Sequence, residues 1–126
     1  MQVKGIIWVG TATAARDELA GFFQEKLGMD VVTDVTGFTR LVTATGDRVE
    51  IFGPEMKEYR QLSTGPVAGF WVDDAQAARD ELLASGVDSC TEIETGRDGH
   101  SWFYFKAPDG NFYELCEHTP VGGTEQ

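Results

Sequence analysis

The sequence predicts an α+β fold made of two successive βαβββ modules, because strand-like and helix-like stretches alternate in the same order in both halves. A repeated set of residues supports this fold class. Two stretches near the start of the chain recur 63 residues later, and the ends of the two halves match at an offset of 64. Trp8-Val9 recurs as Trp71-Val72, and residues 14–19 recur as 77–82. The strand end at 49–52, which follows Gly46, corresponds to 113–116, which follows Gly110. Three matches in the same order indicate internal duplication within the 126 residues.

The first module is predicted to span residues 1–53. Residues 3–9 alternate on a β-rich background and form its first strand. Thr11 or Thr13 is the candidate N-cap of a helix that ends at Gly28, which can adopt the left-handed conformation of a helix stop. Three strands should follow, at residues 30–36, 38–44 and 48–52, separated by glycine-containing turns.

The second module is predicted to span residues 66–118, after a linker at 54–65, and to be followed by a loose tail at 119–126. It should begin with a strand at 67–72. Asp73 or Asp74 is the candidate N-cap of a helix that runs to about Ser85, with Gly86 as its stop. Three more strands are expected at the end of this module, at residues 89–94, 101–106 and 112–117. All four segments are expected to form one domain.

Composition excludes several classes of protein. The formal net charge of −11 opposes binding to nucleic acid, whose phosphates require a basic surface. No apolar run is long enough for a membrane span, and the N-terminus lacks a signal-peptide pattern, so a cytoplasmic location is expected. Cys90 and Cys116 are too few for a zinc site or a disulfide framework and are expected to be buried thiols. The acidity serves solubility, or alternatively attracts a cationic ligand.

Several stretches together resemble the glyoxalase/bleomycin-resistance/extradiol-dioxygenase superfamily, also called the vicinal oxygen chelate proteins. They are Phe22-Phe23, Leu27-Gly28-Met29, Val72-Asp73-Asp74 and residues 108–115, whose sequence Pro-Asp-Gly-Asn-Phe-Tyr-Glu-Leu is the most specific. The resemblance covers about residues 3–118. It implies that each module curls its sheet into a cup, that the paired, curved mixed sheets surround one cavity, and that the chain forms a homodimer.

The same resemblance shows where metal-using relatives place their ligands, on the first and last strands of each module. The last-strand positions correspond to Glu50 and Glu114. The first-strand position of the second module falls at Val67. In the first module it falls at Trp8 when the helices are aligned, and near Lys4 when the internal repeat is aligned. None of these first-strand residues is a histidine.

Only two histidines are present, His100 and His118. His118 lies four residues beyond Glu114 on one strand, about 13 Å away at roughly 3.3 Å per residue, so the two cannot share a metal. His100 could supply one ligand at most. We therefore expect no cofactor. The alternative is one divalent metal held by Glu50, Glu114 and His100.

Strand alternation predicts which residues line the ligand site. The expected ligand-binding residues are Trp8, Glu50, Phe52, Trp71, Trp102, Tyr104, Phe112 and Glu114. The helices should cover the opposite faces, at Val49, Ile51, Phe70, Val72, Phe103, Phe105 and Leu115. Aromatic rings beside carboxylates favour a flat or cationic organic ligand. Core packing of the rings and solvent exposure of the carboxylates are equally simple alternatives.

The first functional hypothesis is a metal-independent, small-molecule-binding protein most similar to the bleomycin-resistance proteins, which sequesters a cationic or aromatic ligand such as an antibiotic. The second is a divalent-metal-dependent lyase, isomerase or dioxygenase of the vicinal oxygen chelate type. A third is a protein-binding module that uses the same groove. The sequence assigns no catalytic residue, because nothing in it orients either glutamate as an acid or base.

Overall fold

The computed structural model describes residues 1–117 and groups them into two compact units. Residues 8–66 form one, here called the first-half unit; residues 1–7 together with 67–117 form the other, the second-half unit. The predicted tail at 119–126 and His118 lie outside the described residues. Within residues 1–117, no helix is both long and apolar enough to cross a membrane.

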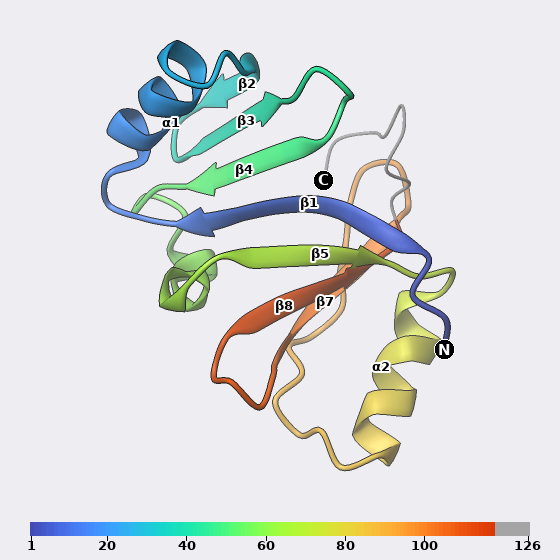
Figure 1. The fold of residues 1–126 in the computed structure, drawn as a ribbon. Coiled ribbons are helices and arrows are strands. Elements are labelled where there is room, and N and C mark those ends of the chain that lie inside the picture. The colour runs from blue at the N-terminus through green and yellow to red at the C-terminus, as the bar shows by residue number, and fades with distance from the viewer. Residues whose placement is uncertain (118–126) are drawn as a thin grey trace. The chain divides into compact units, whose positions relative to one another are not determined.

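The first-half unit follows the predicted order of elements. In chain order they are β1 (Gly5–Ala12, from Trp8 onward in this unit), α1 (Arg16–Glu25), β2 (Asp30–Val35), β3 (Phe38–Val42), β4 (Arg48–Phe52) and the 3-10 helix η1 (Lys57–Thr64). Its strands lie in the order β2-β3-β4-β1, with β1 parallel to β4 and the other pairs antiparallel. Helix α1 packs against β3 and β4, and Figure 1 shows it on one side of this sheet.

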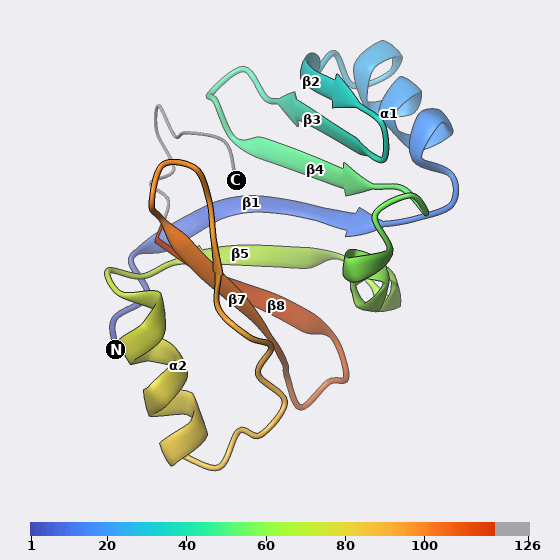
Figure 2. The same ribbon diagram turned by 180° about the vertical axis from the view of Figure 1, so that it is seen from behind.

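The second-half unit repeats this order. Its elements are β5 (Val67–Trp71), α2 (Ala75–Ala84), β6 (Glu94–Thr95), β7 (Ser101–Lys106) and β8 (Phe112–Cys116). The strands lie in the order β5-β8-β7-β6, with β5 parallel to β8. Figure 2 shows α2 and the β7–β8 hairpin from behind. The α+β class and the two βαβββ modules are therefore confirmed.

The two helices begin differently, although a glycine with positive φ follows each of them, Gly28 after α1 and Gly86 after α2. Asp74 caps α2 as predicted, because its side chain accepts the N–H of Ala77. The carboxylate of Glu117 accepts the N–H of Ala75 as well. Helix α1 has Ala15 at its N-cap and no side-chain cap. Thr13, one of the predicted caps, accepts the N–H of Ala15 just before the helix instead.

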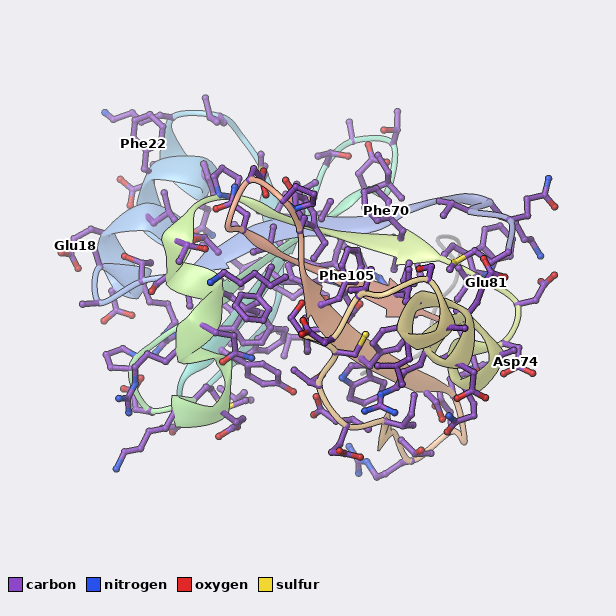
Figure 3. All side chains as sticks on the ribbon, turned by 90° about the horizontal axis from the view of Figure 1, so that it is seen from below. Glu18, Phe22, Phe70, Asp74, Glu81 and Phe105 are labelled. Carbon is purple, nitrogen blue, oxygen red and sulfur yellow. The ribbon has the colours of Figure 1, made fainter. Side chains whose placement is uncertain are left out.

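Each helix covers one face of its own sheet. In the second-half unit, Val72, Phe103 and Leu115 are buried in the cluster under α2. Phe70 and Phe105, labelled in Figure 3, pack against the same cluster. In the first-half unit, Val49 and Ile51 pack against residues of α1. The predicted set of helix-facing residues is confirmed. Of the two thiols, Cys116 is buried and Cys90 is half-buried.

Two segments differ from the predictions. The predicted strand at 89–94 does run beside β7, but the hydroxyls of Ser89 and Thr91 accept the N–H groups of Lys106 and Tyr104. Side-chain acceptors of this kind compete with the backbone ladder, so regular pairing is confined to Glu94–Thr95. The linker lacks the periodic pattern of a helix, yet η1 forms there and buries Leu62.

Candidate functional site

The face of each sheet that points away from its helix is centred on a glutamate. On the first-half unit Glu50 lies in the middle of β4, directly opposite Arg40 on β3 and Gly10 on β1. Side chains that face one another across an antiparallel pair share one side of the sheet. Gly10 allows the backbones to approach closely, because a Cβ there would lie 1.7 Å from the carbonyl oxygen of Glu50.

Arg40 and Glu50 form a buried ion pair. The Nε of Arg40 donates to Oε2 of Glu50 over 2.8 Å, and the two side chains are 8% and 0% exposed. Burial raises the pKa of Glu50 above its usual 4.5, while the guanidinium groups of Arg40 and Arg48 act in the opposite direction. The second oxygen, Oε1, is buried and has no hydrogen-bond partner among the described residues. Only one of the two carboxylate oxygens of Glu50 therefore accepts a hydrogen bond from a guanidinium group.

Two arginines that were not predicted to be site residues also belong to this face. Arg40 and Arg48 are both 6% exposed, and in the registers they share the face of Glu50. Strand alternation contained the necessary signal, since residues 48 and 50 are two apart on one strand. Burial of these arginines was nevertheless not expected from the sequence, because charged side chains are rarely buried.

Aromatic rings lie beside this charged group in the first-half unit. The ring of Phe52 is 6.0 Å from Trp8, 5.2 Å from Phe38 and 4.5 Å from Tyr59, measured between centroids. Trp8 and Phe52 were predicted site residues, and both are buried. Phe38 and Tyr59 were not predicted site residues. Tyr59 lies in the segment that was predicted to be a linker without regular structure. The structure brings these four rings together with the Arg40–Glu50 pair.

The second-half unit presents the matching face with different neighbours. Glu114 is fully buried and lies opposite Tyr104 on β7 and Gly69 on β5. Trp102, also buried, lies opposite Cys116 on the same face. The predicted residues Trp102, Tyr104 and Glu114 therefore come together. No arginine occupies these strands among the described residues.

The remaining predicted residues lie at the margins of this face. Trp71 is half-buried at the end of β5, and the Nζ of Lys4 lies 4.2 Å from its ring centroid, so the chain's own cation occupies one ring face. Phe112 is half-buried at the start of β8. His100 lies in the turn before β7, where its Nδ1 is 3.1 Å from Oδ2 of Asp98.

The registers decide between the two sequence alignments of the first strands. Gly10 lies opposite Glu50, and Gly69 lies opposite Glu114. Trp8 and Val67, each two residues earlier, therefore hold equivalent positions in their own units. The alignment on the helices is correct, and the alignment on the internal repeat, which paired Trp8 with Trp71, is wrong by four residues.

Sequence comparison supports the resemblance proposed from the motifs. Residues 5–115 match the family described as the Glyoxalase/Bleomycin resistance protein/Dioxygenase superfamily. The chain belongs to this superfamily. No curated protein sequence matches it.

Solved structures of the superfamily share the fold. A glyoxalase/bleomycin resistance protein/dioxygenase superfamily member from Vibrio splendidus 12B01 is 20% identical, with a TM-score of 0.70 over 91% of this chain and 98% of that chain. Methylmalonyl-CoA epimerase from Mycobacterium tuberculosis is 20% identical, with a TM-score of 0.66 over 90% and 87%. The Mn(II)-bound glyoxalase from Novosphingobium aromaticivorans is also 20% identical, with a TM-score of 0.66 over 99% of this chain and 42% of that chain. At these identities the likeness establishes the fold alone.

The residues present do not fit the superfamily's metal. The two first-strand positions hold Trp8 and Val67, whose side chains offer no lone pair suited to a metal. Glu50 is already bonded to Arg40. His100 lies four residues before Tyr104, the residue opposite Glu114, so about 13 Å of strand separates it from that carboxylate. No group of three metal-ligating side chains occurs within residues 1–117.

Proposed function

We propose that this protein is a metal-independent, small-molecule-binding member of its superfamily, most similar in function to the bleomycin-resistance proteins. The observation that carries the proposal is the buried Arg40–Glu50 ion pair. Glu50 occupies a position where metal-using relatives have a ligand, and here its charge is met by a guanidinium. A divalent metal would have to displace Arg40, a cation held in a site from which water is largely excluded.

The ligand we propose has a flat aromatic body. The rings of Trp8, Phe38 and Tyr59 lie 6.0, 5.2 and 4.5 Å from that of Phe52. This aromatic group offers stacking and edge contacts worth roughly 0.5–1.5 kcal/mol each beyond the area they bury. The sequence also allowed a cationic ligand, such as a basic antibiotic. Glu50 is a poor partner for such a ligand, because the positive charges of Arg40 and Arg48 already act on it.

Metal content and ligand-induced changes in fluorescence test this proposal together. The protein is purified without chelator, then incubated with zinc, nickel, manganese or ferrous iron and dialysed, and its metal is measured by mass spectrometry. We expect well below one metal per chain in each case. Stoichiometric metal in the native protein that is lost in Glu50→Gln would contradict the proposal. Quenching of tryptophan fluorescence by planar aromatic compounds is the positive result expected.

A divalent-metal-dependent lyase, isomerase or dioxygenase remains the second candidate. The solved structures that share the fold include an epimerase and a Mn(II)-bound glyoxalase, which is the observation in its favour. Glu50, Glu114 and His100 are the ligands of this alternative, and the position of His100 does not support such a set. Turnover of a glyoxalase or epimerase substrate that is abolished by chelator would establish this candidate in place of the first.

We also propose that the protein is a homodimer. Val9 and Phe22 are 44% and 52% exposed on the first-half unit, and Figure 3 shows Phe22 projecting from α1. Val9, Leu19 and Phe23 line an apolar pocket of about 300 Å³ beside them. Apolar surface of this kind commonly marks a protein interface. Sedimentation analysis should give twice the mass of one chain, and Phe22→Asp should shift it toward the monomer.

A further inference from the structure

Arg40 is held rigidly in the first-half unit. Its Nε donates to Oε2 of Glu50 over 2.8 Å, and its guanidinium carbon lies 5.5 Å from the ring centroid of Phe38. Only 8% of the side chain is exposed. A flexible side chain therefore loses its freedom when the protein folds, before any ligand arrives, which lowers the entropic cost of using it in binding.

Most of the hydrogen-bonding capacity of Arg40 remains unused. A guanidinium group has five N–H donors, and Nε supplies one of them to Glu50. The other four belong to the two terminal nitrogens, which have no hydrogen-bond partner within residues 1–117. These four donors lie in the plane that suits two parallel hydrogen bonds to a carboxylate.

The surroundings add positive potential and an apolar wall. Arg48 lies close enough to lower the pKa of Glu50, so the immediate neighbourhood of Arg40 contains a second guanidinium and one carboxylate. The rings of Phe38 and Phe52 lie 5.2 Å apart beside it. An isolated cation would be too weakly hydrated here to be stable, whereas a charge-assisted hydrogen bond gains strength in such a setting.

We infer that Arg40, positioned by Glu50, binds the carboxylate of a small aromatic acid whose ring lies against Phe38 and Phe52. This inference rests on the proposed function and specifies its ligand class. The guanidinium of Arg40 is then the cation of the site, held in position by Glu50. The guanidinium meets the ligand's negative charge without a metal, and Glu50 keeps the guanidinium in place rather than touching the ligand's carboxylate.

Three compounds that share one ring system test the inference on the full chain. They are 2-naphthoate, 2-naphthamide and 2-(aminomethyl)naphthalene, which present an anion, a neutral group and a cation. Calorimetry or ligand-observed NMR gives the affinity of each. We expect the native protein to bind naphthoate at least about ten-fold more tightly than the amide, the value of one charge-assisted hydrogen bond. The amine should bind most weakly.

Variants of Arg40 then test whether the preference for naphthoate over naphthamide depends on this side chain. Arg40→Lys keeps the charge and can keep the ion pair but loses the planar edge, so it should lose most of the preference for naphthoate. The double variant Arg40→Gln with Glu50→Gln removes both charges at once, which avoids leaving a buried carboxylate unpaired, and should bind naphthoate and naphthamide equally. Arg60→Gln is the matched control. It removes a positive charge from an exposed side chain elsewhere in the unit and should leave the preference unchanged.

The possible failures are distinguishable. Equal binding of all three compounds, or unchanged preference in both Arg40 variants, overturns the inference and leaves metal-independent ligand binding intact. Preference for the amine also overturns it and makes the carboxylates the recognition groups. Absence of binding by all three overturns the inference, whereas stoichiometric metal bound through Glu50 overturns the proposed function itself.

Discussion

The two units place a glutamate at the same point and surround it differently. Glu50 faces Arg40 across the β3–β4 pair, and Glu114 faces Tyr104 across the β7–β8 pair. Both carboxylates are fully buried, and each has a glycine on its other side, on the parallel strand. Duplication has thus preserved the backbone frame and the carboxylate, while the residue opposite the carboxylate is an arginine in one unit and a tyrosine in the other. The backbone frame alone therefore does not determine the chemistry of the site.

The largest expected effect comes from removing the guanidinium. Arg40→Ala should lower the free energy of unfolding by roughly 3–5 kcal/mol near neutral pH, because it leaves Glu50 as an unpaired buried charge. Tyr104→Phe, at the equivalent position, removes only a hydroxyl and should cost about 1 kcal/mol. Urea unfolding measures both. Equal losses would mean that the two glutamates are held in the same way.

The glycine beside Glu50 gives the next largest effect. Gly10→Ala would place a methyl group 1.7 Å from the carbonyl oxygen of Glu50, so β1 and β4 must separate. We expect a loss of about 1–3 kcal/mol or more, the usual cost of over-packing. Gly21→Ala is the control, since the nearest atom there is 3.7 Å away and α1 should gain roughly 0.5–1 kcal/mol. A neutral Gly10→Ala would show that the close approach is not required.

The two helix starts should respond in opposite directions. Asp74→Ala removes the cap of α2 and should cost about 1 kcal/mol, whereas Ala15→Asp supplies a cap to α1 and should stabilise by roughly 0.5–1 kcal/mol. Thermal unfolding of the two variants beside the native chain measures this. If Ala15→Asp does not stabilise, the backbone conformation of residue 15 does not let its side chain reach the first turn of α1.

The smallest expected effect is a change in the pH dependence of stability. Because the pKa of Glu50 is higher in the folded chain than its usual 4.5, the folded state holds this proton more tightly than the unfolded state does. The contribution of Glu50 to the free energy of unfolding therefore decreases as pH rises from about 4.5 through the raised pKa. Arg40 and Arg48 oppose the effect of burial, so the change is smaller than burial alone would cause.

Glu50→Gln should remove this decrease, so the stability of the variant relative to the native chain should rise with pH over the same range. Urea unfolding at several pH values from 4.5 upward measures it. Glu58→Gln, at an exposed carboxylate of η1, is the control. Parallel pH profiles of the native chain and Glu50→Gln would contradict the raised pKa.

Much of the fold was predictable because periodicity reports which face of a strand or helix is covered. The helix-facing residues, such as Ile51 and Phe103, were all assigned correctly even though the repeat alignment was wrong by four residues. A shift of four is close to one helical turn and is an even number along a strand, so it changes neither face. The repeat alignment therefore misplaced residues along each strand and helix but assigned their side chains to the correct face.

The site was less predictable, because strand alternation places side chains on a face without stating their partners. Glu50 was identified, but Arg40 is ten residues away in sequence and reaches it only through the β3–β4 register. Tyr59 contacts Phe52 from a segment without any periodic signal. The expected absence of a metal stays a prediction, because the family's ligand pattern is matched only at Glu50 and Glu114, while Trp8 and Val67 hold the first-strand positions. The cytoplasmic location remains a prediction.

The first seven residues open the first copy of the repeat but belong to the second-half unit. The backbone N–H of Lys4 donates to the carbonyl of Trp71, its side chain pairs with Asp73, and the N-terminal amine pairs with Glu81. The opening of the first copy thus completes the second copy. A cut in the linker would leave residues 1–7 on the N-terminal fragment, although they belong to the second-half unit. The halves can therefore be tested by fragment complementation and not as two free-standing proteins. A circularly permuted chain that begins within η1 would keep residues 1–7 covalently linked to both the first-half and the second-half unit.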